Sequence, residues 1–423
     1  YAREDTSFME RMAPEHPALA MLLRRAIRQA AQEKDVATME SLAKRLDKVD
    51  GDSPYHWFLL GKAYVRTDQF DALRDKLPEW RRRFPDEDEF LLMLAEERRE
   101  AGDVEGQRDA LERALRTPST RGALLYAEFL LEQRELKKLN EFLATAPAKL
   151  QDTAAFLEIR ARLRLLEARP RDAVADLSSA FSRLQDTPDA LFAAFRRARS
   201  WMGAERLETL LTDYAREAGT SAGHALLVLA SELWRNAGIA EGRIVGAKDY
   251  LATMPEDHPL VTRGWQVILE AWHRMNRPKE AAAVGRRLIE DGVRRPSVLN
   301  NYAYACALIG EDLEGAAAWA QDAIERAESD RQKAAYYDTL ALLYERMGRI
   351  GEAGDALASS IQYHEAPYQR VRYARLLAEQ REFFEAGRQL SHAAEQAKEA
   401  NDSKLLGQID AVREQYPGIE EQE

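Results

Sequence analysis

Residues 57–64 read WFLLGKAY, and this stretch decides the fold of the chain. Its members Trp57, Leu60, Gly61 and Tyr64 recur at intervals of three or four, so they share one face of a helix. A glycine between large apolar side chains lets a neighbouring helix approach closely. Pro85 then ends the unit, because proline cannot continue a helix interior. The stretch therefore predicts two helices that pack as a hairpin around a short turn.

The same helix–turn–helix pattern returns about every 33–38 residues along the chain. A period of this length is typical of helical solenoids, in which each hairpin packs on its neighbours. We predict about ten such hairpins between Ser53 and Asp402, preceded by a divergent helical pair at Pro17–Gln32 and Asp35–Val49. The turns inside the hairpins are expected near Asp68, Gly102, Arg134, Arg169, Gly203, Gly238, Asn276, Gly310, Gly348 and Arg381.

The order W-x-x-L-G-x-x-Y resembles the tetratricopeptide repeat, and the later segment Gly348–Ala353 is similar to the turn of that family. The resemblance covers roughly 350 residues of the chain. It implies an all-α, right-handed α-solenoid superhelix of about 10–11 hairpins. The Ala- and Arg-rich usage, with the repeat start Leu299–Ala303, looks like bacterial tetratricopeptide proteins, many of which are scaffolds or adaptors.

Three segments follow from this pattern. Residues 1–52 are expected to form the divergent N-terminal hairpin, and residues 53–402 the repeat superhelix. Residues 403–423 are expected to form a C-terminal capping helix and an acidic tail, Glu420–Glu423. The apolar residues of this last helix lie on one stripe and its other faces are polar, as a solenoid cap requires.

Composition limits the choice of partners. The chain has 423 residues and a formal net charge of -11, so nucleic acid is not an expected partner. Basic clusters at Arg81–Arg83 and around Arg196 lie near helix ends, where cations stay solvated or interact with the helix dipole. The single cysteine, Cys306, excludes an intrachain disulfide.

The compartment stays open at this stage. No apolar run approaches the length of about 20 residues that spans a bilayer. Because the chain starts at Tyr1, either a signal or anchor segment has been removed or the chain is a fragment. The resemblance to bacterial envelope proteins favours the periplasm or cell envelope over the cytoplasm.

No pattern of catalytic residues stands out. The seven histidines form no H-E-x-x-H motif, and the glycines form neither a phosphate-binding loop nor a G-x-S-x-G turn. The carboxylates lie mostly beside Arg and Lys on helical faces, where solvated ion pairs are the ordinary outcome. We therefore expect no enzymatic activity, no cofactor and no metal.

In the tetratricopeptide family the first helices of the hairpins line a concave groove. The resemblance therefore implies that residues beside the packing positions of the later first helices contact a protein or peptide partner. The mixture of amide, aromatic and charged groups suits an extended peptide. The predicted partner-binding residues are Gln266, Glu270, His273, Arg274, Asn300, Asn301, Tyr304, Asp338, Leu342, Glu345, Arg346, Val371 and Arg375.

Two known binding modes of the family do not fit these residues. The carboxylate clamp needs lysines that the neighbouring first helices lack, and the asparagine ladder needs Asn at one position in many repeats. Asn301 occupies that position, but Thr339 replaces it one repeat later. Asn300 and Asn301 also fit a second interpretation, as a helix-start and packing pair.

Alternatives to an adaptor remain. The chain is also interpretable as a self-assembling structural scaffold and, against its charge, as an RNA-binding helical-repeat protein. The repeats from Ser119 to Gly219 depart most from the family, with Arg160 and Arg164 at positions where large apolar residues are expected. Ordinary repeat drift, altered curvature or a contact surface each explain that departure.

Overall fold

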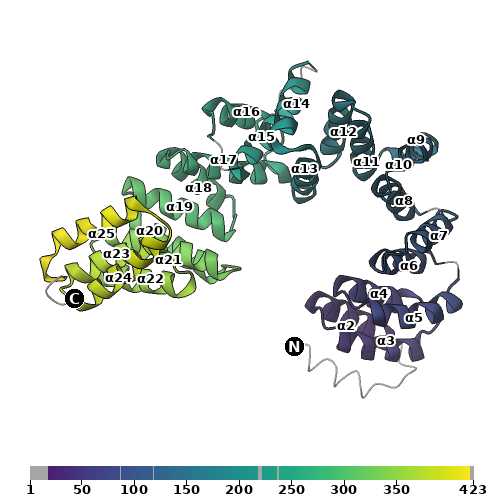
Figure 1. Ribbon diagram of the computed structural model, residues 1–423, viewed down its shortest axis with the longest axis horizontal. Coiled ribbons are helices and arrows are strands. Elements are labelled where there is room, and N and C mark those ends of the chain that lie inside the picture. The colour runs from purple at the N-terminus through teal and green to yellow at the C-terminus, as the bar shows by residue number, and fades with distance from the viewer. Residues whose placement is uncertain (1–17, 86, 118, 218–221, 236–237, 420–423) are drawn as a thin grey trace. The chain divides into compact units, whose positions relative to one another are not determined.

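The computed structural model describes residues 18–85, 87–117, 119–217, 222–235 and 238–419. Within these ranges the chain forms α-helices and one short 3-10 helix, and no strand (Figure 1). Consecutive helices pair as hairpins, so the predicted all-α class with repeated hairpins is confirmed. The chain divides into two compact units, Tyr1–Ala180 and Phe181–Glu423.

Among its described residues, the first unit contains five helix pairs and a one-turn insertion. Its first pair corresponds to the divergent hairpin expected before residue 53, although Pro17 lies outside the described residues. The second helix of the last pair runs across the boundary between the units. The helices are α2 (Leu19–Glu33), α3 (Val36–Val49), α4 (Tyr55–Arg66), α5 (Phe70–Arg83), α6 (Asp88–Glu100), α7 (Val104–Ala114), α8 (Thr120–Glu132), α9 (Leu136–Thr145), α10 (Ala148–Gln151), α11 (Ala154–Leu166) and α12 (Pro170–Arg183).

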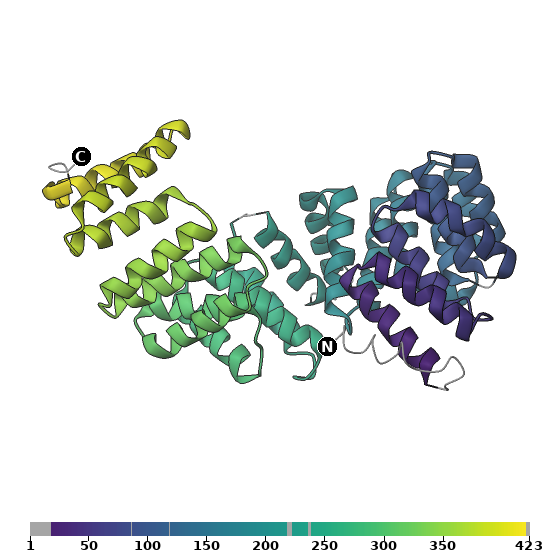
Figure 2. The same ribbon diagram turned by 90° about the horizontal axis from the view of Figure 1, so that it is seen from below.

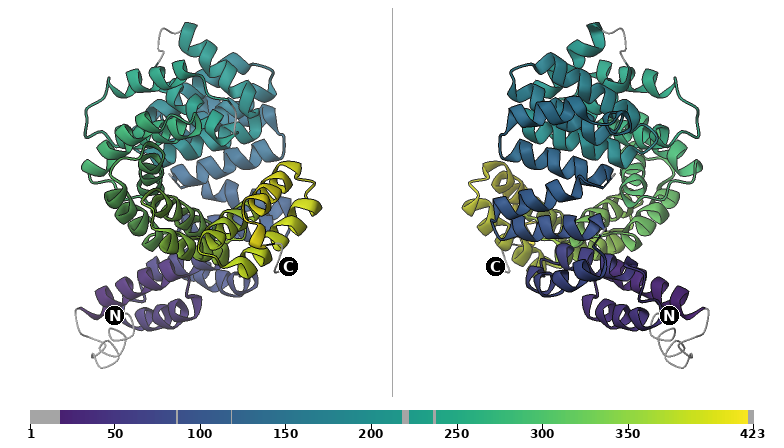
Figure 3. Two further views of the ribbon diagram at one scale, coloured as in Figure 1. Left: turned by 90° about the vertical axis from the view of Figure 1, so that its left-hand side faces the viewer. Right: turned by 90° about the vertical axis from the view of Figure 1, so that its right-hand side faces the viewer.

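In the part that the structure describes, the second unit contains six helix pairs and a final helix, stacked in sequence order from teal to yellow (Figures 2 and 3). The final helix packs on both members of the last pair, and the tail predicted at Glu420–Glu423 lies outside the described residues. The helices are α13 (Pro188–Met202), α14 (Ala204–Glu217), α15 (Ala222–Trp234), α16 (Glu241–Leu251), α17 (Pro259–Arg274), α18 (Pro278–Glu290), α19 (Pro296–Ile309), α20 (Leu313–Glu325), α21 (Asp330–Arg346), α22 (Ile350–Tyr363), α23 (Pro367–Glu379), α24 (Phe383–Glu399), α25 (Ser403–Gln415) and the 3-10 helix η1 (Pro417–Ile419).

Local signals set where the helices begin and turn. The side chains of Asp35, Ser119 and Ser329 each accept a hydrogen bond from the backbone N–H three residues later, which satisfies a free donor at a helix start. At the turns inside hairpins one residue takes a left-handed conformation, with φ of 71° at Gly102 and 72° at Gly348. The other predicted turn positions with positive φ are Asp68, Arg134, Gly203, Asn276, Gly310 and Arg381.

The motif that opens the sequence builds the core of the first unit. Trp57 and Tyr64 stack on Trp80 of the second helix, with ring centroids 5.4 Å and 6.5 Å apart. Their polar atoms reach the preceding hairpin, where the Tyr64 hydroxyl donates to Glu40 at 2.6 Å. Gly61 faces Met93 of α6, and an added Cβ would lie 2.4 Å from the Met93 sulfur. The motif therefore joins three successive hairpins, because each large residue fills space beside a small one.

Candidate partner-binding surface

The first helices α15, α17, α19 and α21 of the second unit form a continuous layer. Helix α15 contacts α17, α17 contacts α19, and α19 contacts α21, in each case directly across the repeat boundary. Among the described residues, no pair of successive second helices in this unit reaches comparable contact. Successive hairpins are therefore closer together on the side of their first helices than on the side of their second helices. The residues predicted to bind a partner lie on α17, α19 and α21 of this layer and on the next first helix, α23.

Side chains of α17 and α19 meet on this surface. The side-chain amide oxygen of Gln266 accepts hydrogen bonds from Arg263 at 2.9 Å and from Arg295 at 3.2 Å. The His273 and Tyr304 rings meet edge to face, with centroids 4.9 Å apart. Asn301 lines a small cavity between α13, α15, α17 and α19. Four positions chosen from the sequence thus face neighbouring first helices.

Two predicted contact residues are buried instead. Val371 is 6% exposed and belongs to the apolar core that α23 forms with α24 and α25. Its assignment to an open groove is therefore wrong for this surface, because a small apolar side chain is more stable within the core. Asn300 is 9% exposed, which favours the interpretation of this residue as a packing residue.

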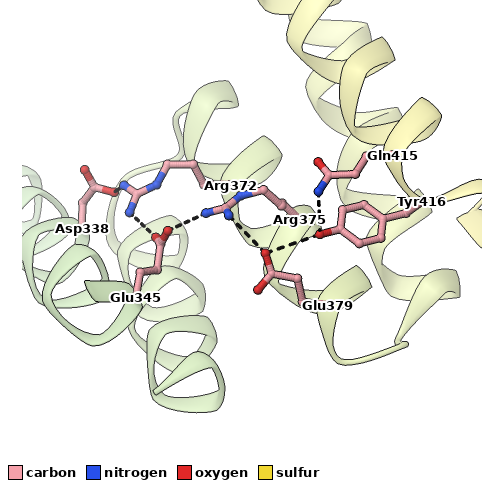
Figure 4. A network of polar contacts seen from close by, with 7 residues as sticks. All are labelled: Asp338, Glu345, Arg372, Arg375, Glu379, Gln415 and Tyr416. Atoms are coloured by element: carbon pink, nitrogen blue, oxygen red, sulfur yellow. Dashed lines mark hydrogen bonds and ion pairs between the residues drawn. The ribbon is translucent and has the colours of Figure 1, made fainter. Parts of the chain in front are cut away.

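Polar residues of α21, α23 and the C-terminal end of α25 form a network of ion pairs and hydrogen bonds across the repeat boundary (Figure 4). Arg372 donates to both Asp338 and Glu345, and Arg375 donates to Glu345 and, at 3.1 Å, to Glu379. Its seven members are Asp338, Glu345, Arg372, Arg375, Glu379, Gln415 and Tyr416. Three predicted binding residues, Asp338, Glu345 and Arg375, therefore already hold partners within the chain.

The first-helix layer shifts the pKa of several of its groups. Burial raises the pKa of Asp338, and Arg372 opposes that shift. The dense protein around Glu270 raises its pKa in the same way, although Arg274 and Arg263 oppose the rise. Burial lowers the pKa of His273, and the nearby Arg274 lowers it further. His273 is thus neutral at pH 7 and offers a hydrogen-bonding ring to a ligand rather than a charge.

Sequence reasoning missed two members of this surface. Arg372 lies one turn before Arg375 on the same helix face and shares its network, so helical spacing from the predicted Arg375 would have found it. Tyr368 is 49% exposed, and its hydroxyl interacts electrostatically with Asp338, Arg372 and Tyr304. Tyr368 was not predicted as a binding residue because it lies in the first turn of α23, where the sequence was interpreted as a helix start.

The first unit has a separate cavity on its own first helices. Its volume is about 310 Å³, and its floor is apolar, with Leu59 and Ala63 from α4 and Leu92 and Met93 from α6. Glu89 at the rim pairs with Lys62 at 3.3 Å and with Arg121 at 2.7 Å. Sequence reasoning did not select this cavity, since its lining consists of motif-adjacent apolar residues that also suit a closed core.

Two further searches apply to the described ranges only. Within them, no helix combines the length and apolar content that a membrane crossing needs. In the same ranges, no group of three or more His, Cys, Asp or Glu side chains is arranged to hold a metal ion.

The comparisons with known proteins give solved structures of low sequence identity to this chain. No protein-family model matches the chain, and no curated protein matches it. The chain is similar to a chain of the APC/C heterotetramer Cut9–Hcn1, at 14% identity and a TM-score of 0.34, over 86% of this chain and 84% of that one. It is similar to yeast Tom70 at 11% identity and a TM-score of 0.30, over 94% and 96%. It is also similar to a chain of Naa15/Naa10 bound to HypK, at 14% identity and a TM-score of 0.31, over 98% of this chain and 72% of that one.

The hairpins of the chain itself define its class. Paired helices of 10–17 residues, a left-handed residue at many of the turns, and adjacent first helices in contact make this an all-α repeat protein of stacked helical hairpins. The motif W-x-x-L-G-x-x-Y does in the structure what the resemblance implied, because Gly61 admits a neighbouring helix and the aromatic rings fill the space around it.

Proposed function

We propose that this protein is a non-catalytic interaction scaffold that binds an extended segment of a partner protein on the first-helix layer of its second unit. One observation carries the proposal: α15, α17, α19 and α21 form a continuous layer that carries polar and aromatic side chains such as Gln266, His273 and Tyr304. Peptide backbones need donors and acceptors along their length, and such a layer supplies them. The resemblance to bacterial proteins adds a role in envelope assembly, polysaccharide export or protease regulation to this proposal.

The ion-pair network narrows the choice of contact residues. Asp338 and Glu345 hold α23 in place through Arg372, so they act as supports for the surface. Asn301 and Tyr304 are partly exposed, and Arg346 is exposed at the end of α21. These three residues are the direct contacts that we propose for a partner on α19 and α21.

The test compares two triple variants in pull-downs from a lysate of the source organism. The first variant carries Asn301→Ala, Tyr304→Ala and Arg346→Ala. The second is a matched control on exposed second-helix positions, with Gln321→Ala, Glu325→Ala and Lys398→Ala. We expect a partner that the wild-type protein and the control retain and the first variant loses.

Two other outcomes contradict the proposal. A partner retained by both variants would place binding elsewhere, for example at the cavity of the first unit. Concentration-dependent oligomers in light scattering, with no partner captured, would instead support a self-assembling scaffold.

A further inference from the structure

An arginine cluster at the start of the second unit is not explained by internal ion pairing. Its residues are Arg196 and Arg199 of α13, Arg263 of α17, and Arg295, which immediately precedes α19. None of these four side chains forms an ion pair among the residues that the structure describes. This is unexpected in a chain with 72 acidic and 61 basic side chains, where carboxylates are in excess.

Aromatic rings hold three of these arginines close together. The guanidinium groups of Arg196 and Arg199 lie over the Trp234 ring, 5.4 Å and 5.1 Å from its centroid. Arg263 lies over Phe192 at 5.3 Å, and the Phe192 and Trp234 rings are themselves 6.2 Å apart. Stacking on an aromatic face orients a guanidinium while leaving its N–H edge available.

Two of the four arginines retain unused donors. The Nε atoms of Arg199 and Arg263 are buried and have no hydrogen-bond partner. Burial lowers the pKa of both side chains, and Arg295 and Arg196 lower that of Arg263 further. Buried charge without a paired anion is unfavourable, although arginine stays charged in proteins. The cluster therefore carries positive charge that the chain itself leaves uncompensated.

The nearest carboxylates do not complete the cluster. Asp189 and Glu270 act on Arg263 electrostatically, but neither is paired with it. Glu208 acts on Arg199, but its carboxylate is already bound by Arg235 at 2.7 Å. Because Asp189, Glu270 and Glu208 leave the charge of the cluster unpaired, an external anion can compensate it.

A cavity that Arg263 and Trp234 line borders this cluster and limits the size of the ligand group. Its volume is about 80 Å³, which fits a carboxylate or a small side chain. The lining combines apolar residues, such as Leu233 and Val267, with Arg263, Gln266 and Asn301. Trp234, which is 37% exposed, also borders it. The cavity thus offers guanidinium donors next to an apolar surface.

We propose that this arginine cluster binds an acidic segment of a partner protein, in which Asp or Glu side chains flank an apolar or aromatic one. Carboxylates match the paired donors of a guanidinium, and the flanking side chain contacts Trp234 and the apolar lining. A nucleic-acid backbone fits less well, since it needs long basic stripes and Glu270 lies in the same lining. The inference rests on the proposed function, because it names the chemistry of the segment bound on the first-helix layer.

The experiment selects ligands without assuming their sequence. Random 12-residue peptides displayed on phage are selected on the full-length wild-type protein, and the enriched peptides are measured by fluorescence anisotropy. We expect enrichment of Asp and Glu beside Phe, Tyr, Trp or Leu. We also expect Kd to rise about tenfold or more in R196Q/R263Q, because each removes a charge-assisted hydrogen bond. Kd should stay unchanged in the control R388Q, an exposed arginine of α24.

Each other outcome has a defined meaning. Enriched peptides without acidic residues, or equal Kd values for R196Q/R263Q and wild type, would overturn the inference. Peptides whose binding depends on Asn301 and Tyr304 alone would overturn the inference but support the proposed function, whereas no enriched peptide would count against both. If R196Q/R263Q fails to fold by circular dichroism, R196Q alone decides, because Arg196 is exposed. Competition by single-stranded DNA at lower concentration than a Glu-rich peptide would overturn the inference in favour of a general polyanion site.

Discussion

Two helix–helix contacts of this protein, one within a hairpin and one between successive hairpins, solve the same packing problem with different chemistry. In the hairpin α11/α12, Asp176 is 3% exposed and receives Arg160 at 2.6 Å and Arg164 at 2.7 Å. Between α18 and α19, Gly285 lies against Tyr302, and the neighbouring Ala303 is fully buried. The first contact is held by a nearly buried ion pair, and the second by close approach of a backbone to a ring.

The difference explains the departure of the middle repeats from the family pattern. Arg160 and Arg164 replace apolar residues because they bind a carboxylate from the facing helix. Related pairs recur nearby, since Glu97 receives Arg74 at 2.6 Å and Glu208 receives Arg235 at 2.7 Å. A repeat that looks degenerate in sequence thus keeps its hairpin, provided that every charge it buries is paired.

The largest expected effect comes from breaking the ion-paired hairpin. Asp176→Ala leaves two guanidinium groups without their shared anion, and we expect the free energy of unfolding to fall by about 3 kcal/mol. Urea titration followed by circular dichroism measures the change. The control replaces Arg160, Arg164 and Asp176 together by Leu, which should cost less than Asp176→Ala alone. A triple variant less stable than the single one would show that the charges are needed for packing.

The small-residue contact is tested by a matched pair of glycines in helices. Gly285→Ala places a Cβ 2.8 Å from the Tyr302 Cβ, which α19 holds in place, and we expect a loss of about 2 kcal/mol. Gly354→Ala meets nothing closer than 3.5 Å, so helix propensity should raise stability by up to about 1 kcal/mol. Thermal unfolding of both variants gives the comparison. Similar shifts for both would mean that close approach does not limit Gly285.

Between α21 and α23, ion pairs join successive first helices rather than the two helices of a hairpin. Arg372→Met removes the cation shared by Asp338 and Glu345, while Glu345 keeps Arg375. We expect a loss of about 1–2 kcal/mol, smaller than for Asp176→Ala because these groups are less buried. A double-mutant cycle with Asp338→Ala isolates the pair. Full additivity of the two single changes would show that Arg372 and Asp338 do not interact.

The smallest effect depends on pH. Arg108 and then Lys138 bind Glu135 and lower the pKa of its carboxyl to about 2. Because the folded pKa lies below the unfolded one, the stabilisation is present above the ordinary pKa of Glu and disappears as the pH falls toward 2. We expect the contribution to stay below about 1 kcal/mol, since the pair is partly solvated.

Urea midpoints at pH 7 and pH 3 measure this contribution. Wild type should lose more stability between these values than Glu135→Gln does, because the variant has no carboxyl to protonate. The same loss in both proteins would mean that Glu135 does not contribute to the acid sensitivity of this region.

Prediction from the sequence succeeded where it depended on local pattern. The spacing from Trp57 to Tyr64 indicated one helix face, and the structure places both side chains in the core. Val371 failed because a groove position was assigned by counting from the motif, whereas α25 contributes to the core around that residue. The arginine cluster was not predicted as a site, because Arg263 and Trp234 belong to different helices whose contact is not written in either segment.

The sequence by itself determined the class of fold and the hairpin repeat. Helical periodicity, capping residues and left-handed turn positions act within a few residues of one another, so they can be read directly from the chain. Only the tertiary structure decided which charges are paired. Arg160 and Arg196 are both helical arginines that the sequence alone does not distinguish. Arg160 pairs with the nearly buried Asp176, whereas Arg196 lies over the Trp234 ring without a carboxylate partner. That outcome depends on which helix packs opposite. An ion pair needs its two charges close together, and residues on different helices come that close only after the chain has folded.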